Sequence, residues 1–126
     1  MALEVYLIFN GNCREAVEFY AKVFDTEKPN IMTFGEAHSD NSDFKLPEEA
    51  KNLIMHANIN VRGSRLMFSD NFPGTPYTVG NNITVALIDD DLDYMKRAFE
   101  MLQEGGKVEM ELQETFWSKA YGSIID

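Results

Sequence analysis

The sequence contains one cysteine, two histidines and no apolar run long enough to cross a membrane. With Cys13 alone an internal disulfide is impossible, which fits a reducing compartment. The N-terminus leads directly into a strand-like pattern, without the basic segment and apolar core of a signal peptide. We therefore expect a cytoplasmic protein with no membrane partner.

Positive charge is also scarce. Eleven Lys and Arg residues stand against 21 Asp and Glu residues, so the formal net charge is −10. Without a Lys/Arg cluster the chain has no means of releasing counterions from a phosphate backbone. We therefore expect no nucleic-acid partner. The acidic excess favours solubility, and its functional alternative is attraction of a cationic ligand.

Glycine-rich phosphate loops are missing as well. The eight glycines form neither GxGxxG nor GxxxxGK[ST], the spacings that let backbone N–H groups converge on a phosphate. Gly11 stands alone between a predicted strand and a predicted helix, and we interpret it as a turn glycine. Nucleotide binding and methyl transfer from S-adenosylmethionine are therefore not expected.

Apolar residues are abundant and well distributed. Hydrophobic residues make up 44% of the 126 residues and aromatic residues 12%, which is typical of one packed globular domain. The stretch 36–51 is the polar exception and predicts a surface loop.

A strand followed directly by a helix opens the chain. Residues 3–9 are mostly β-branched, aromatic or aliphatic and end at the turn signal Asn10-Gly11. Asn12 and Glu15 have the spacing of a capping box and predict a helix start. The helix carries one apolar stripe of Cys13, Ala16, Val17, Tyr20, Val23 and Phe24. We expect this stripe to cover the sheet to which the first strand belongs.

The second half repeats the pattern. Residues 82–89 predict a strand, Asp89 to Asp91 offer N-caps, and the following helix should end at Gly105-Gly106. Its apolar stripe is Leu92, Met95, Ala98, Phe99 and Leu102. Because the stripes align when Phe9 is placed on Leu87, we infer a duplicated module within one domain 1–126, with module 1 at 1–72 and module 2 at 80–126.

More strands follow each helix. We predict them at 30–35, 53–61, 65–70, 107–113 and 117–125, with a hairpin turn at Gly63-Ser64. If each half is βαβββ, the second half lacks its last strand within the 126 residues. We therefore expect either a second copy of the chain covering the open edge or a native C-terminus about one strand longer.

Several stretches together resemble a known family. "YLIFNGNCREAVEFYAKVF", "HANINVRGSRLMFSD", "NNITVAL" and "LQETFWSKAYGSIID" are similar to the PhnB-like branch of the glyoxalase/bleomycin resistance/dioxygenase (vicinal oxygen chelate) superfamily. The resemblance covers essentially the whole chain. It implies an α+β fold in which two βαβββ modules form curled mixed sheets around a cleft, usually in a homodimer, here with the last strand of module 2 missing.

The resemblance also bears on metal binding. Metal enzymes of the superfamily take ligands, mostly His and Glu, from the first, fourth, fifth and eighth strands. The corresponding positions here are Val5 or Tyr6, then 67–70, then Ile83 or Thr84, and the eighth strand is absent. Because the sequence departs from the superfamily's ligand pattern at these positions, we expect no metal cofactor. A divalent metal held by atypical ligands is the alternative.

Two polar residues are weak candidates for acid/base chemistry. Strand alternation places His56 and Asn58 on one face, away from Ala57 and Ile59. A single His on a strand is more often a hydrogen-bonded polar residue than an acid or base. Asp70 ends a strand, where it is either a local hydrogen-bond acceptor or a carboxylate at the cleft mouth that could pair with His56.

The aromatic candidates have several possible roles. Trp117 suits a core, a dimer interface or a cleft wall, and by alternation Tyr121 shares its face. Tyr6 is either core or cleft. The predicted ligand-binding set is Tyr6, His56, Asn58, Met67, Ser69, Asp70, Trp117 and Tyr121. Cys13 is expected to be a buried, inert thiol because it lies on the apolar stripe.

From these features we expect a cleft that binds a small organic ligand without the usual metal set, and leave open whether the protein is an enzyme. One alternative is a metal-dependent glyoxalase- or dioxygenase-type enzyme. The other is an antibiotic-sequestering resistance protein, a role with which the acidic charge is compatible.

Overall fold

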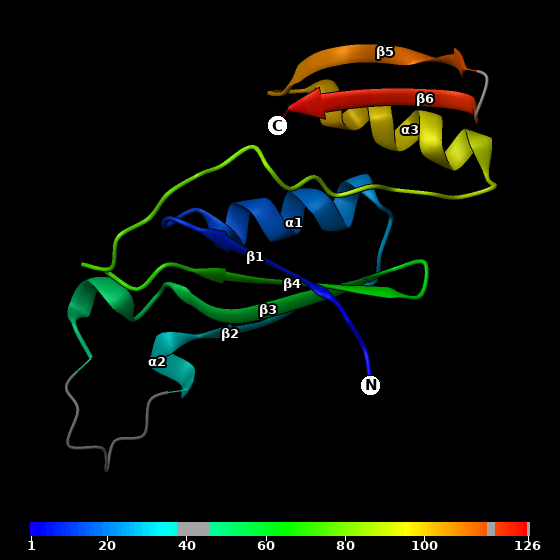
Figure 1. Cartoon of the computed structure of the whole chain (residues 1–126). Helices are drawn as coiled ribbons and strands as arrows, with labels where there is room; N and C mark the ends of the chain where they lie inside the picture. Colours follow the sequence, from blue (N-terminus) through cyan, green and yellow to red (C-terminus); the bar gives the residue numbers. More distant parts are fainter. Residues whose placement is uncertain (38–45, 116–117, 126) are drawn as a thin grey trace. The chain divides into compact units, whose positions relative to one another are not determined.

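The computed structural model describes residues 1–37, 46–115 and 118–125. They form two compact units, unit 1 at Met1–Val79 and unit 2 at Gly80–Asp126 (Figure 1). No helix in the described part of the chain has the length and apolar character needed to span a membrane.

Unit 1 is a mixed four-stranded sheet with a helix on one face (Figure 1). Its elements are β1 (Val5–Phe9), α1 (Cys13–Val23), β2 (Asn30–Thr33), α2 (Phe34–Ala37), a 3₁₀ turn (Glu48–Ala50), β3 (Ile54–Val61) and β4 (Ser64–Asp70). The strand order is β1-β4-β3-β2. β1 runs parallel to β4, and the other neighbours are antiparallel. The predicted α+β class is confirmed.

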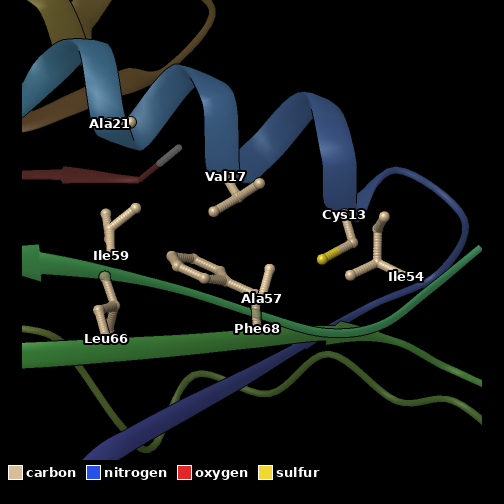
Figure 2. Packing of buried hydrophobic residues seen from close by; sticks show 8 residues of the cluster. All are labelled: Cys13, Val17, Ala21, Ile54, Ala57, Ile59, Leu66 and Phe68. Carbon is tan, nitrogen blue, oxygen red and sulfur yellow. The ribbon is translucent and has the colours of Figure 1, made fainter. Parts of the chain in front are cut away.

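The core of unit 1 lies between α1 and this sheet. Cys13 and Val17 of α1 are fully buried, and Phe68 of β4 lies beneath the helix with no exposed surface (Figure 2). Ala21, Ile54, Ala57, Ile59 and Leu66 complete the buried cluster. The α1 stripe and the strand alternation thus meet as predicted, because each element buries only its apolar side.

Local side-chain chemistry moves one predicted boundary. The strand expected at 30–35 ends at Thr33, where α2 begins. The Thr33 hydroxyl accepts from the Glu36 N–H at 3.1 Å, and the Glu36 carboxylate accepts from the Thr33 N–H at 3.4 Å. This is a capping box, and it starts a helix inside the expected strand.

The β3–β4 hairpin turns one residue earlier than predicted. Val61 pairs with Ser64, so the loop is Arg62-Gly63 and not Gly63-Ser64. Both loop residues are left-handed, with φ of 50° and 93°. Positive φ at both central residues is what a type I′ turn requires, and this turn matches the twist of the flanking strands.

The predicted capping box at the start of α1 is wrong. Asn12 occupies the N-cap position, but its side chain makes no capping hydrogen bond. The carboxylate of Asp70, at the end of β4, instead accepts from the Cys13 N–H at 3.0 Å. A distant acceptor has therefore replaced the local one.

Unit 2 contains α3 (Leu92–Gln103), β5 (Lys107–Thr115) and β6 (Ser118–Ile125), and the two strands pair antiparallel. The N-cap expected at 89–91 is confirmed at Asp91, whose side chain accepts from the Tyr94 N–H at 3.1 Å. The strand expected at 82–89 is wrong, because residues 83–89 have no regular structure. A strand needs a hydrogen-bonded neighbour, and the described residues pair none with this segment.

Candidate functional site

The open face, defined as the face of the unit 1 sheet opposite α1, gathers most of the predicted ligand-binding residues. Met67 of β4 lies opposite Tyr6 of β1 on one side and opposite Asn58 of β3 on the other. Asn30 of β2 lies opposite Asn58 and extends this cross-strand row. In the same way, Ser69 lies opposite Ile8. These residues share a face because side chains alternate along each strand.

Tyr6 and His56 are in contact across β4. The Tyr6 hydroxyl lies 3.4 Å from His56 Nδ1, and the ring centroids are 5.8 Å apart. The hydroxyl can donate to Nδ1 when that nitrogen carries no proton. Tyr6 keeps 45% of its surface exposed. An aromatic face and two adjustable polar groups are therefore available to a molecule that binds here.

The remaining groups on the open face are uncharged near the centre. The Asn30 side-chain amide donates to the Asn58 side-chain oxygen at 3.3 Å. Met32 lies opposite His56 and is exposed, whereas Ser69 is 8% exposed. The charged groups Glu4 and Arg65 neutralise each other in an ion pair at 2.6 Å. The residues named here therefore offer hydrogen bonds and apolar contact without a net charge among them.

Asp70 lies on the opposite face of the sheet from His56. Its neighbour on β1 is Phe9, which packs with Phe68 in the core beneath α1. The residue is 4% exposed. The structure therefore does not bring Asp70 and His56 together as an acid/base pair.

The Asp70 carboxylate is occupied by backbone donors. Oδ1 accepts from the N–H groups of Gly11 at 2.9 Å and Cys13 at 3.0 Å. Oδ2 accepts from the N–H of Ile54 at 2.9 Å. The carboxylate therefore joins the β1–α1 turn and the start of β3 to the end of β4. Asp70 therefore acts as a hydrogen-bond acceptor at the end of a strand, which is the first of the two roles predicted for it.

Cys13 is a buried thiol beneath α1 (Figure 2). Burial, and secondarily the negative charge of Asp70, raise the pKa of Cys13 to about 12, against a smaller lowering by Arg14. Because the thiolate is the reactive form, the thiol is inert near neutral pH, as its place on the stripe predicts.

The structure does not show whether two of the predicted ligand-binding residues lie near the open face. Trp117 lies outside the described residues. Tyr121 belongs to β6 of unit 2, where its backbone is opposite Gln113, and its side chain lies outside the described part. The cleft between the two modules stays a prediction.

The residues at the superfamily's metal positions do not fit a metal ion. Val5 and Ile83 have no side-chain donor atom, and both carboxylate oxygens of Asp70 already accept backbone hydrogen bonds. Among the described residues, no group of three or more His, Cys, Asp or Glu side chains could hold a metal ion. No chemical step through a metal is derived from this site.

Sequence reasoning missed the contribution of β2 and the end of β1. Asn30, Met32 and Ile8 also belong to the open face. The signal was available in part, because Ile31 between Asn30 and Met32 packs against the core. A four-residue strand is too short, however, for alternation alone to assign its faces.

Comparison with known proteins places this fold. A sequence profile described as the glyoxalase/bleomycin resistance protein/dioxygenase superfamily matches residues 2–126. The protein YjdN of Escherichia coli K12 is 34% identical over 134 aligned residues, which cover 100% of this chain and 88% of YjdN.

Two solved structures are also similar. The crystal structure of protein PA1353 from Pseudomonas aeruginosa is 36% identical with a TM-score of 0.79, covering 99% of this chain and 90% of that one. The PhnB protein from Bacillus cereus is 20% identical with a TM-score of 0.71, covering 98% and 90%. The second likeness shows the shared fold. With the profile match and the YjdN relative, the chain belongs to the glyoxalase/bleomycin resistance protein/dioxygenase superfamily.

Proposed function

We propose that this protein is a PhnB-like superfamily member that binds a small organic ligand on the open face of unit 1. The observation that carries the proposal is the contact between Tyr6 and His56 on a face that α1 leaves uncovered. A surface aromatic ring beside hydrogen-bonding groups recognises an organic molecule by stacking and by its polar edge. No reaction is assigned to the site.

The composition of the open face supports an uncharged polar or aromatic ligand. Asn58 supplies a hydrogen-bonding amide, and its cross-strand neighbour Met67 supplies apolar contact. Among the described residues of this face, the guanidinium of Arg65 is already paired with the Glu4 carboxylate. A phosphate or carboxylate ligand would therefore lack a charged partner on this face.

A thermal-shift screen tests ligand binding. We expect a compound from a panel of aromatic metabolites, thiol conjugates and cationic antibiotics to raise the melting temperature, because it binds only the native state. Tyr6→Ala and His56→Ala should abolish that rise. Glu18→Ala, an exposed position on α1, should retain it. A shift that survives both open-face substitutions would place the ligand elsewhere.

Binding without a metal is part of the proposal, and the positions that fail to offer ligands support it. Metal analysis of the purified, dialysed protein tests it directly. Stoichiometric zinc, nickel, manganese or iron would favour the metal-dependent glyoxalase- or dioxygenase-type enzyme instead. A rise in melting temperature with a cationic antibiotic alone would favour sequestration, for which the net charge of −10 is suited.

We further propose a cytoplasmic homodimer. Exposed apolar side chains on β1, including Val5 and Ile8, support self-association along this edge strand. Light scattering of the purified chain should give twice the monomer mass of 14.4 kDa. A monomer across the micromolar range would contradict the dimer without affecting ligand binding.

A further inference from the structure

Unit 2 contains a groove between α3 and β5. The helix contacts both strands of its sheet, and the groove lies along its contact with β5. Its volume is about 250 Å³. Pockets for drug-sized ligands measure roughly 300–1,000 Å³, so this groove suits a smaller molecule. The lining residues are Lys96, Phe99, Glu100 and Gln103 of α3 and Glu111 and Leu112 of β5.

The four helical residues share one side of α3. Lys96 and Glu100 are four residues apart, as are Phe99 and Gln103, and this spacing makes them neighbours on the helix surface. Phe99 and Gln103 are half-buried, whereas Lys96 and Glu100 are exposed. The helix therefore supplies an aromatic and an amide group inside the groove and two opposite charges at its edge.

A β-bulge brings two consecutive residues of β5 into the same groove. β6 has one residue, Gly122, between Tyr121 and Ser123. The matching stretch of β5 has two, Glu111 and Leu112, between the partners of these residues. In a regular strand only one of two neighbouring side chains could face the helix. The extra residue of the bulge disrupts this alternation and re-aims a side chain, so both residues line the groove.

Gly122 sets the position of the aromatic ring. A Cβ atom at Gly122 would lie 2.7 Å from the Phe99 ring and 3.0 Å from the Met110 carbonyl oxygen. Any side chain at this position would therefore displace the ring, and the glycine lets Phe99 lie directly against β6. The ring also lines the groove, where its face offers apolar contact and attracts cations.

The charges of the groove favour a cation. Glu100 belongs to α3 and Glu111 to β5, so carboxylates stand on both walls, and Lys96 is the only cation among the lining residues. Two carboxylates and one ammonium group give these residues a formal charge of −1. A bound monocation would make the groove neutral, whereas an anion would meet two like charges.

We propose that this groove binds a small primary amine. The apolar body of the amine packs on Phe99 and Leu112, and its ammonium group lies between Glu100 and Glu111. An ammonium group has three donors, so it can also donate to the side-chain oxygen of Gln103. The site is independent of the ligand proposed for unit 1, because none of its residues belongs to the open face.

Titration of the full chain with 2-phenylethylamine at low ionic strength tests the proposal. The amide resonances are followed by two-dimensional NMR. Two control ligands are its uncharged analogue 2-phenylethanol and its anionic analogue 3-phenylpropionate. We expect saturable shifts of the amides at 96–103 and 110–113 with the amine, and binding at least about tenfold weaker for both controls, because they lack the cation.

Charge variants separate a specific site from general attraction to an acidic protein. Glu100→Gln and Glu111→Gln should each weaken amine binding about fivefold, the upper range for an exposed ion pair. Glu104→Gln removes the same charge from an exposed position outside the groove and should leave binding unchanged. Lys96→Gln should strengthen binding roughly twofold, because it removes a like charge.

The replaced side chains are all exposed, so each variant should keep the fold, and its amide spectrum without ligand checks this. Equal loss of affinity in Glu100→Gln and Glu104→Gln would overturn the proposal, since the net charge alone would then attract the amine. Shifts confined to unit 1, or no saturable shift at millimolar amine, would also reject the groove as the site. Equal binding of 2-phenylethanol would exclude the carboxylates as its selective groups.

Discussion

Asp70 is the residue on which the connections within unit 1 most depend. Its carboxylate accepts three backbone hydrogen bonds, from Gly11, Cys13 and Ile54, while 4% exposed. In Asp70→Asn the side-chain NH₂ must face at least one of these N–H groups. We expect the free energy of unfolding to fall by about 2–3 kcal/mol, the range for lost hydrogen bonds to a buried charge.

Chemical denaturation of Asp70→Asn measures this loss. Asp90→Asn is the matched control, because Asp90 is exposed. It should change stability by less than about 0.5 kcal/mol. If Asp70→Asn were as stable as the parent chain, the three hydrogen bonds would not contribute to the fold.

Cys13 should make stability fall at high pH. The pKa of Cys13 is raised from 9.0 to about 12 in the folded protein, mainly by burial. Between these values the folded chain keeps the thiol proton and the unfolded chain releases it. The unfolded state therefore binds fewer protons, and stability decreases as pH rises through this window. Below about pH 9 both states are protonated and the effect is absent.

Comparison with Cys13→Ala isolates the effect. The difference in unfolding free energy between the parent and Cys13→Ala should shrink as pH rises from about 9 to about 12, since alanine has no titrating group. At pH 8 a thiol reagent should label the parent chain only as fast as the chain opens. Rapid labelling of the folded protein would show that Cys13 is accessible.

At the scale of elements, the packing of α1 can be tested at Val17. This residue is fully buried and contacts the core formed by β3 and β4 (Figure 2). Val17→Ala removes two methyl groups and leaves a cavity, so we expect a loss of about 2–3 kcal/mol. Thermal and denaturant unfolding measure it, with the exposed Glu18→Ala as control. A change within about 0.5 kcal/mol would mean that the stripe does not form the core.

Helices and strands with a clear hydrophobic periodicity were predictable from the sequence. The α1 stripe and the alternation around Ala57 and Ile59 matched the observed burial, because a helix or strand with one apolar side has one way to bury it. The same alternation placed His56 and Asn58 on the open face. Hydrophobic periodicity could not show which strands pair with each other.

The missed features depend on partners that local patterns do not contain. Asp70 caps α1 from the end of β4, so the nearby pair Asn12 and Glu15 was a misleading signal. The segment 82–89 has strand propensity but no partner among the described residues, and propensity alone does not make a strand. The role of Asp70 follows from residues that are close in space but far away in the sequence, so no local pattern indicated it.

At the scale of the whole molecule, the two units differ in their cores. In unit 1 a helix covers a four-stranded sheet, and large side chains such as Phe68 and Ile54 are fully buried. In unit 2 a helix lies against two strands, and Tyr94 and Ala98 are the buried apolar residues among those whose side chains are described. Two strands and one helix with so little buried surface are marginal in water.

We therefore predict that the units differ in their ability to fold alone. A fragment of residues 1–79 should show a cooperative thermal transition and protected amides in β3 and β4, because its core cluster lies wholly within unit 1. A fragment of residues 80–126 should lack both, since Tyr94 and Ala98 are the buried apolar residues among its described side chains, too few to offset the entropy of folding. Circular dichroism and hydrogen exchange measure both properties. Val17→Ala within fragment 1–79 provides the control, and it should lower the transition temperature as it does in the full chain. If fragment 1–79 were unfolded while the full chain is stable, the core of unit 1 would require unit 2, and the asymmetry between the units would not govern folding.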